Sequence, residues 1–230
     1  MKNEGKSYIM DGVNCRKANV RMKRKVTRLK KRISSASAVC LSAALMAAGL
    51  TACAAPAKEE GTTVSVSKEG AVSLHIIESF DKPYYDQDEL QQMILSEAAD
   101  YNREVGAGNV SVEKIVVEDN MAVVDMTYAS AADYAGFQGG IFFLGTAKEA
   151  QEAGYELNVV LSGAEDELKT IGMSDMLAMS EYQLLITDMK ETVTLNGKAE
   201  YVSDNVIFSE NRKTVAFGGE EGELAYVMYR

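Results

Sequence analysis

The sequence predicts an α+β fold, in which an antiparallel sheet carries a long N-terminal helix and short helices packed on it. Apolar and polar residues alternate over short stretches such as 72–77, which indicates strands. One longer stretch, 90–105, has apolar residues at helical spacing. From residue 182 onward the chain reads as strands joined by tight turns. Because strands do not alternate regularly with helices, α+β is favoured over a doubly wound parallel sheet.

The helix at 90–105 has a clear start and a clear end. Asp86 and Glu89 have the spacing of a capping box, in which Asp86 accepts from helix N–H groups and Glu89 reaches back. Gly106 and Gly108 predict its end. Its apolar face consists of Leu90, Met93, Ile94, Ala98, Tyr101 and Val105.

Two strands, 110–117 and 121–128, are predicted next, joined at Glu118-Asp119-Asn120. Ser130 and Asp133 have the spacing to cap a short helix. The apolar run 141–144 then follows a pair of glycines, which break the chain before it.

Thr146 and Glu149 form a capping box for another short helix that ends at Gly154. A strand is predicted at 155–161, and residues 163–181 read as helical or irregular.

The last part of the chain reads as an antiparallel meander. Asn196-Gly197 is a strong hairpin signal between strands at 192–195 and 198–202. Further strands are predicted at 206–208, 214–217 and 224–229. The last strand is apolar, so we expect the C-terminus to be tied into the sheet.

The N-terminal part has the pattern of a secretory leader. A basic region holds Lys23, Arg24, Lys25, Arg28, Lys30, Lys31 and Arg32. The apolar stretch that follows, 36–50, is too short for a spanning helix, which needs roughly 20 apolar residues. It closes with Leu50-Thr51-Ala52-Cys53.

These four residues resemble the lipobox of bacterial lipoprotein signal peptides. The resemblance implies that the sulfur of Cys53 receives a diacylglyceryl group, that a peptidase cuts before Cys53, and that acyl chains such as palmitate hold the mature protein in the membrane. An ordinary cleaved signal peptide with a chance cysteine is the alternative. The other cysteines, Cys15 and Cys40, precede the cleavage site, so no disulfide framework and no catalytic thiol is expected.

The predicted organisation has four parts. Residues 1–21 read as an upstream extension, since translation from Met22 would give an ordinary signal peptide at 22–52; an unusually long basic region is the alternative. Residues 53–70 read as the lipidated cysteine and a flexible tether, because they are small and polar. Residues 71–230 are expected to form a single extracytoplasmic domain.

Charge changes sign after the leader. The first 53 residues hold 12 of the 24 Lys and Arg residues and 2 of the 34 Asp and Glu residues, which leaves a balance of −20 for the remainder. Such an acidic domain is a poor match for nucleic acid, whose phosphates need clustered Lys and Arg. Anionic headgroups also repel it, so the lipid on Cys53 must provide the anchor.

Catalytic and metal motifs are missing from the sequence. His75 is the only histidine, and we expect it to be a half-exposed strand residue rather than part of a catalytic relay. Carboxylates at Asp86, Asp88 and Glu89 suit calcium, but the calcium-loop pattern is absent and helix capping explains two of them. No catalytic residue, metal ligand or cofactor is therefore predicted, and the sequence leans against an enzyme.

The globular part resembles uncharacterised small lipoproteins of Gram-positive clostridia, through Tyr84-Tyr85-Asp86, Glu89-Leu90 and Tyr101-Asn102. This resemblance brings no known function with it. The sequence favours a lipoprotein on the extracytoplasmic face of the cell membrane that binds an envelope protein partner without catalysis. The alternatives are a single-domain receptor for a small solute or cation and, less favoured, a hydrolase of wall or glycan that uses carboxylates.

Overall fold

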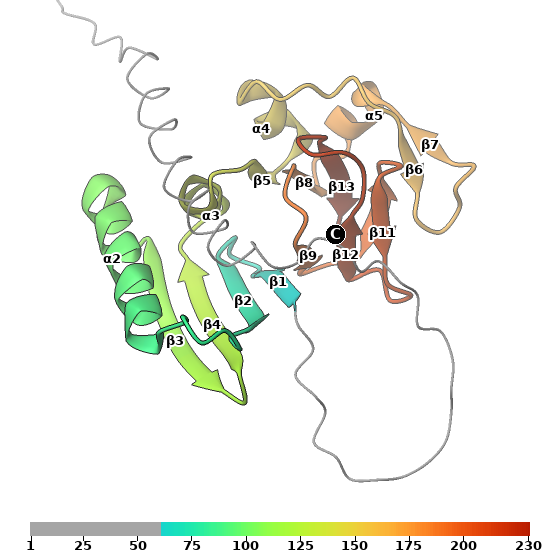
Figure 1. The fold of residues 1–230 in the computed structure, drawn as a ribbon. Helices are drawn as coiled ribbons and strands as arrows, with labels where there is room; N and C mark the ends of the chain where they lie inside the picture. The colour runs from blue at the N-terminus through green and yellow to red at the C-terminus, as the bar shows by residue number, and fades with distance from the viewer. Residues whose placement is uncertain (1–60) are drawn as a thin grey trace, which may run out of the picture. The chain divides into compact units, whose positions relative to one another are not determined.

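The computed structural model describes residues 61–230, which form an α+β fold of mostly antiparallel strands with few helices (Figure 1). The predicted fold class is confirmed at this level. The described elements are β1 (Gly61–Val66), β2 (Val72–Ser79), α2 (Gln87–Val105), β3 (Val110–Glu118), β4 (Met121–Tyr128), α3 (Ala131–Gln138), β5 (Phe142–Gly145), α4 (Ala147–Glu152), β6 (Leu161–Gly163), β7 (Thr170–Ile171), α5 (Met173–Ala178), β8 (Gln183–Thr187), β9 (Thr192–Thr194), β10 (Ala199–Val202), β11 (Val206–Phe208), β12 (Thr214–Phe217) and β13 (Ala225–Tyr229).

The strands of residues 61–230 form two sheets rather than the one that the sequence suggested. Sheet A has the order β11-β12-β9-β1-β2-β4-β3, and sheet B has the order β5-β8-β13-β10-β6-β7. Neighbouring strands are antiparallel in both sheets, except that β1 and β9 are parallel. Residues 61–135 and 140–230 belong to one compact unit.

The described residues begin at Gly61 with β1, inside the segment predicted to be a tether. β1 lies between β2 and β9, where Val64 and Val66 are almost fully buried and Thr63 and Ser65 are exposed. The prediction of a tether through residue 70 was wrong, because residues 61–66 form β1. That prediction relied on the small size of the side chains in this segment. The alternation of valine with hydroxyl residues in β1 is nevertheless the period of a strand with one buried face.

Helix α2 starts at the predicted cap, and four of the six residues of its predicted apolar face are buried, whereas Val105 is exposed. The Asp86 side chain accepts a hydrogen bond from the Glu89 N–H at 3.0 Å, and α2 packs against β3 (Figure 1). Gly106 follows the helix with a φ of 136°, which glycine adopts readily. The buried residues of α2 are Leu90, Ile94, Ala98 and Tyr101.

The turn between β3 and β4 is formed by Asp119 and Asn120, both with positive φ. Two consecutive residues of this kind give a turn whose twist matches antiparallel strands. β3 is an edge strand of sheet A, and its register shifts between Val112 and Lys114. A bulge with charged side chains discourages pairing with another chain at such an edge.

The strand predicted at 155–161 is mostly irregular, and only β6 at its end pairs with neighbours. The Tyr226 hydroxyl donates to the Glu156 carbonyl at 2.9 Å. Leu157 is buried although it lies outside any strand. The prediction failed because a side chain, rather than a neighbouring strand, satisfies a backbone group of this segment.

Asn196-Gly197 does not form the predicted hairpin. β9 before it pairs within sheet A, while β10 after it pairs within sheet B, so the segment carries the chain from one sheet to the other. The Lys198 N–H donates to the Arg230 carbonyl at 2.8 Å, and the Arg230 N–H donates to the Lys198 carbonyl at 3.2 Å. The C-terminal end of the chain therefore occupies the place that a hairpin partner would take.

The predicted meander is also wrong, because the strands after residue 182 divide between the two sheets. β11 and β12 pair in sheet A, whereas β13 lies between β8 and β10 in sheet B. Every residue of β13 is buried. The C-terminus is thus tied into a sheet, as expected, but through a central strand.

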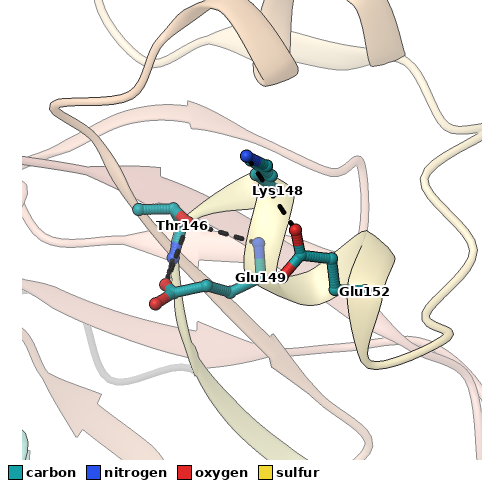
Figure 2. A network of polar contacts seen from close by, with 4 residues as sticks. All are labelled: Thr146, Lys148, Glu149 and Glu152. Carbon is teal, nitrogen blue, oxygen red and sulfur yellow. Dashed lines mark hydrogen bonds and ion pairs between the residues drawn. The ribbon is translucent and has the colours of Figure 1, made fainter.

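Helix α4 begins with the predicted capping box. The Glu149 N–H donates to the Thr146 hydroxyl at 3.3 Å, while the Thr146 N–H donates to the Glu149 carboxylate at 2.7 Å. Figure 2 shows this reciprocal pair, together with the ion pair between Lys148 and Glu152 on the same helix. The hydrogen bonds from Thr146 lower the pKa of Glu149, because they favour its charged form.

We expect Thr146→Ala to lower the free energy of unfolding by about 1 kcal/mol near neutral pH. A carboxyl group with a lowered pKa stabilises the fold above its unfolded pKa of about 4.3, and this stabilisation is lost as the pH falls through the folded pKa. The difference between wild type and Thr146→Ala should therefore shrink in acid. Urea unfolding at several pH values measures it, and a difference that grows in acid would contradict the assignment.

Candidate functional site

A pocket of about 630 Å³ lies within the compact unit, bounded by segments that are far apart in the sequence. Its wall comes from the turn between β1 and β2, the first turn of α3, strand β5, and the ends of β8 and β13. Its residues are Val66, Ser67, Lys68, Glu69, Gly70, Ala129, Ser130, Ala131, Ala132, Ala135, Phe142, Phe143, Leu144, Tyr155, Gln183, Asn196 and Tyr229. This volume is typical of sites for small ligands.

The turn wall is held in place by its own hydrogen bonds. The Ser67 N–H donates to the Ala71 carbonyl at 2.9 Å, and the Ser67 hydroxyl accepts from the N–H groups of Glu69 and Ala71 at 3.2 Å each. Gly70 has a φ of 86°, and the Asn196 amide donates to the Ser67 carbonyl. This wall is therefore largely preformed.

The α3 wall is fixed by a buried carboxylate. Asp133 accepts from the Ser130 hydroxyl at 2.6 Å, from the Asn109 amide at 2.7 Å and from the Tyr101 hydroxyl at 3.4 Å. Burial and the nearby charge of Asp133 raise the pKa of Tyr101 to about 12, which keeps this hydroxyl a donor. Asp133 thus ties the start of α3 to α2.

The side chains of α3 that line the pocket are small. The apolar wall that they form therefore lies close to the backbone of α3. Ala131, Ala132 and Ala135 are its three alanines in the lining. Alanine adds apolar surface without filling the space. A larger side chain at Ala135 would occupy the pocket itself.

Aromatic rings form the β5 wall. The rings of Phe143 and Tyr155 lie 4.9 Å apart, and Phe142 makes an edge-to-face contact with Tyr134 at 4.8 Å. Burial raises the pKa of Tyr155, and it raises the pKa of Tyr229, at the end of β13, to about 12. β5 is also an edge strand of sheet B, so this wall presents backbone as well as rings.

The lining gives the pocket a defined chemistry. Ser130, Gln183 and Asn196 offer neutral polar groups, while Lys68 and Glu69 supply one charge of each sign. No histidine or cysteine occurs among these lining residues. Such a surface suits a ligand that is mostly apolar and carries little net charge.

A second polar feature lies on the solvent face of sheet A. His75 Nδ1 and Asp125 Oδ1 are 2.5 Å apart on neighbouring strands, with side chains 46% and 34% exposed. His75 is half-exposed, as predicted. A carboxylate beside a histidine orients the ring, as in catalytic relays, but neither residue lines the pocket.

The predicted lipidation site and lipobox, at Cys53 and Leu50-Thr51-Ala52, lie outside the described residues, so they stay predictions. Within residues 61–230, no group of three or more His, Cys, Asp or Glu side chains has a metal-binding arrangement. The helices of that range are all too short or too polar to span a membrane.

Sequence reasoning missed both features that the structure reveals. His75 and Asp125 meet because β2 and β4 are neighbours, and only the strand order shows this. The pocket joins segments from Val66 to Tyr229, so no local motif marks it. The run of alanines between residues 129 and 135 was its only local signal. Comparison of the chain with protein-family models, curated proteins and solved structures gives no match.

Proposed function

We propose that this chain is a lipid-anchored lipoprotein of the extracytoplasmic membrane face, and that it binds an envelope protein without catalysing a reaction. The basic region, the short apolar stretch and the cysteine at position 53 support the anchor. Two or three acyl chains are enough for stable anchoring. An acidic domain would depend on them, because anionic lipids repel it.

The pocket is the observation that carries the binding function. Three consecutive residues of edge strand β5 line it, and alanines of α3 line it as well. An extended segment of a partner protein can pair with the backbone of an edge strand while its side chains enter a neighbouring pocket. The apolar lining favours a segment with small or medium apolar side chains and little charge.

The position of the pocket also suits a partner outside the membrane. β1 runs from Gly61, where the chain arrives from Cys53, to Val66 at the pocket. Six strand residues span roughly 20 Å. A domain anchored before Gly61 would therefore carry the pocket away from the end that receives the tether.

A free small solute is the second candidate, and the pocket volume favours it. A volume of about 630 Å³ lies within the range of small-ligand sites. The aromatic pair Phe143 and Tyr155 would contact an apolar ring or chain, and Gln183 would supply a hydrogen bond. Such a ligand would raise the melting temperature of the isolated protein without any partner.

Ala135→Phe tests the pocket directly. We expect this substitution to obstruct the pocket and abolish recovery of the partner when the acylated protein is crosslinked and purified from its native membranes. Ala99→Phe, on an exposed position of α2, is the matched control and should retain the partner. Circular dichroism must show both variants folded.

The outcomes separate the two candidates. Partner recovery by wild type and Ala99→Phe, but not by Ala135→Phe, supports protein binding through the pocket. Equal recovery by all three proteins contradicts the pocket as the binding site. A third outcome is that wild type recovers no partner, whereas a solute raises its melting temperature and Ala135→Phe removes that rise. This outcome favours a solute receptor over a protein-binding function. Mass spectrometry of the mature N-terminus tests acylation of Cys53 separately.

A further inference from the structure

An aromatic loop lies at the end of sheet A where the chain enters the described fold. Gly61 pairs with Ile77, and β2 ends two residues later at Ser79. The loop 80–85 follows, beginning with an N–H of Phe80 that donates to the Asn120 carbonyl at 2.6 Å. Loop and entry point therefore share one end of the β1–β2 hairpin, and the pocket lies at the other.

Three rings in this loop contact one another. The Phe80 and Tyr85 rings lie 4.8 Å apart, and Tyr84 meets Tyr85 edge to face at 5.1 Å. The Tyr85 N–H donates to the Lys82 carbonyl at 3.0 Å, which closes a tight turn around Pro83. Tyr84 is 72% exposed, so the fold leaves this ring in solvent although its neighbours pack.

The distance to the anchor limits what this loop can meet. Eight peptide units separate Cys53 from Gly61, and they reach at most about 28 Å when fully extended. If Cys53 is acylated, the loop spends its time close to the lipid headgroups. A tether of this length gives the loop a high effective concentration at the membrane surface. Even a weak contact between the loop and the lipids is therefore populated.

We propose that loop 80–85 rests on the bilayer, with the ring of Tyr84 at the level of the lipid headgroups. The inference depends on the proposed acylation of Cys53. Tyrosine suits this position because its ring is apolar and its hydroxyl stays wet. The preformed turn means that little conformational freedom is lost on contact.

Charge keeps the contact shallow. Lys82 and Asp81 form an ion pair with 2.7 Å between Nζ and Oδ1, so the loop itself carries no excess cation. The neighbouring start of α2 is acidic, with Asp86, Asp88 and Glu89. Anionic headgroups repel these carboxylates, which would limit the contact to the aromatic tip.

The absence of tryptophan from the chain allows a clean test. Tyr84→Trp introduces a single fluorescent indole that keeps the aromatic, amphipathic character of the position. The acylated variant is placed in vesicles of phosphatidylcholine and phosphatidylglycerol, with the phosphatidylcholine brominated near the headgroup end of its acyl chains. Bromine quenches an indole only when the two are close.

Glu69→Trp is the matched control, in the exposed turn at the opposite end of the same hairpin. This substitution removes a negative charge that anionic headgroups would repel. The change of charge therefore favours membrane contact at the control position. We expect a blue shift and loss of fluorescence for Tyr84→Trp, and neither quenching nor dependence on brominated lipid for Glu69→Trp. Without acylation, in Cys53→Ser, quenching at position 84 should disappear.

Four results would overturn the proposal. The first is no quenching at position 84 in protein that mass spectrometry shows to be acylated, which leaves the lipoprotein assignment intact. The second is equal quenching at positions 84 and 69, which indicates no preferred orientation. The third is a blue shift in native membranes without quenching by brominated lipid, which indicates a protein partner at the loop. Absence of acylation refutes the proposed function and this inference together.

Discussion

A chain that begins at residue 71 is expected not to fold, whereas one that begins at residue 54 should fold and unfold cooperatively. Removing β1 leaves β2 and β9 without their shared neighbour in the middle of sheet A. It also removes Val64 and Val66, which are 1% and 6% exposed. Each buried valine contributes about 1.5–3 kcal/mol, and the lost hydrogen bonds expose two strand edges.

The expected loss is comparable with the whole stability of an ordinary domain, about 5–15 kcal/mol. Far-UV circular dichroism and urea unfolding of the two soluble chains measure it. The double substitution Thr63→Ala and Ser65→Ala is the matched control, because it changes the exposed face of β1 and leaves the valines in place. A cooperative transition in the chain that begins at residue 71 would show that β1 is dispensable.

Gly197→Ala is expected to destabilise the protein by about 1–3 kcal/mol, because the added Cβ forces the backbone at position 197 away from the backbone of Arg230. A Cβ at position 197 would lie 2.5 Å from the Arg230 carbonyl carbon and 2.6 Å from its oxygen. Relief of this clash requires the C-terminal residue to move, which breaks its paired hydrogen bonds with Lys198. The Arg230 guanidinium, 4.9 Å from the centre of the Tyr182 ring, would move as well.

Thermal unfolding of Gly197→Ala beside Gly61→Ala measures this effect. A Cβ at Gly61 meets nothing within 4 Å, and Gly61 does not have a positive φ. For a domain of this size, we expect a fall in Tm of roughly 2–4 °C per kcal/mol for Gly197→Ala and little change for the control. Equal melting temperatures would contradict the close approach of the two backbones.

The contrast between these regions shows what local sequence determines. Asp86 and Thr146 cap their helices as predicted, because a cap involves residues three apart in the chain. Asn196-Gly197 carries the strongest hairpin signal, yet the partners of β9 and β10 lie elsewhere in the chain. A turn signal states where the chain bends and leaves open which strands pair after it.

The same limit applies to the candidate site. Ser130 and Asp133 were recognised as a helix start, but their position beside a pocket depends on Asn109 and Tyr101, which hold Asp133 from other elements. Alanines that leave space and aromatic rings that enclose it are ordinary core residues when read in sequence. They line a pocket only because the fold brings α3, β5 and the β1–β2 turn around one space.

The central position of β1 has a mechanical consequence. If Cys53 is acylated as proposed, a pull on that anchor reaches Gly61 and acts along β1, whose hydrogen bonds to β2 and β9 lie across the direction of force. These bonds must shear together, whereas an edge strand pulled sideways loses them one at a time. β13 at the other end of the chain is likewise enclosed, between β8 and β10. Tension applied at Gly61 therefore meets a strand paired on both sides, and forced unfolding is governed by the rate at which these two rows of hydrogen bonds break.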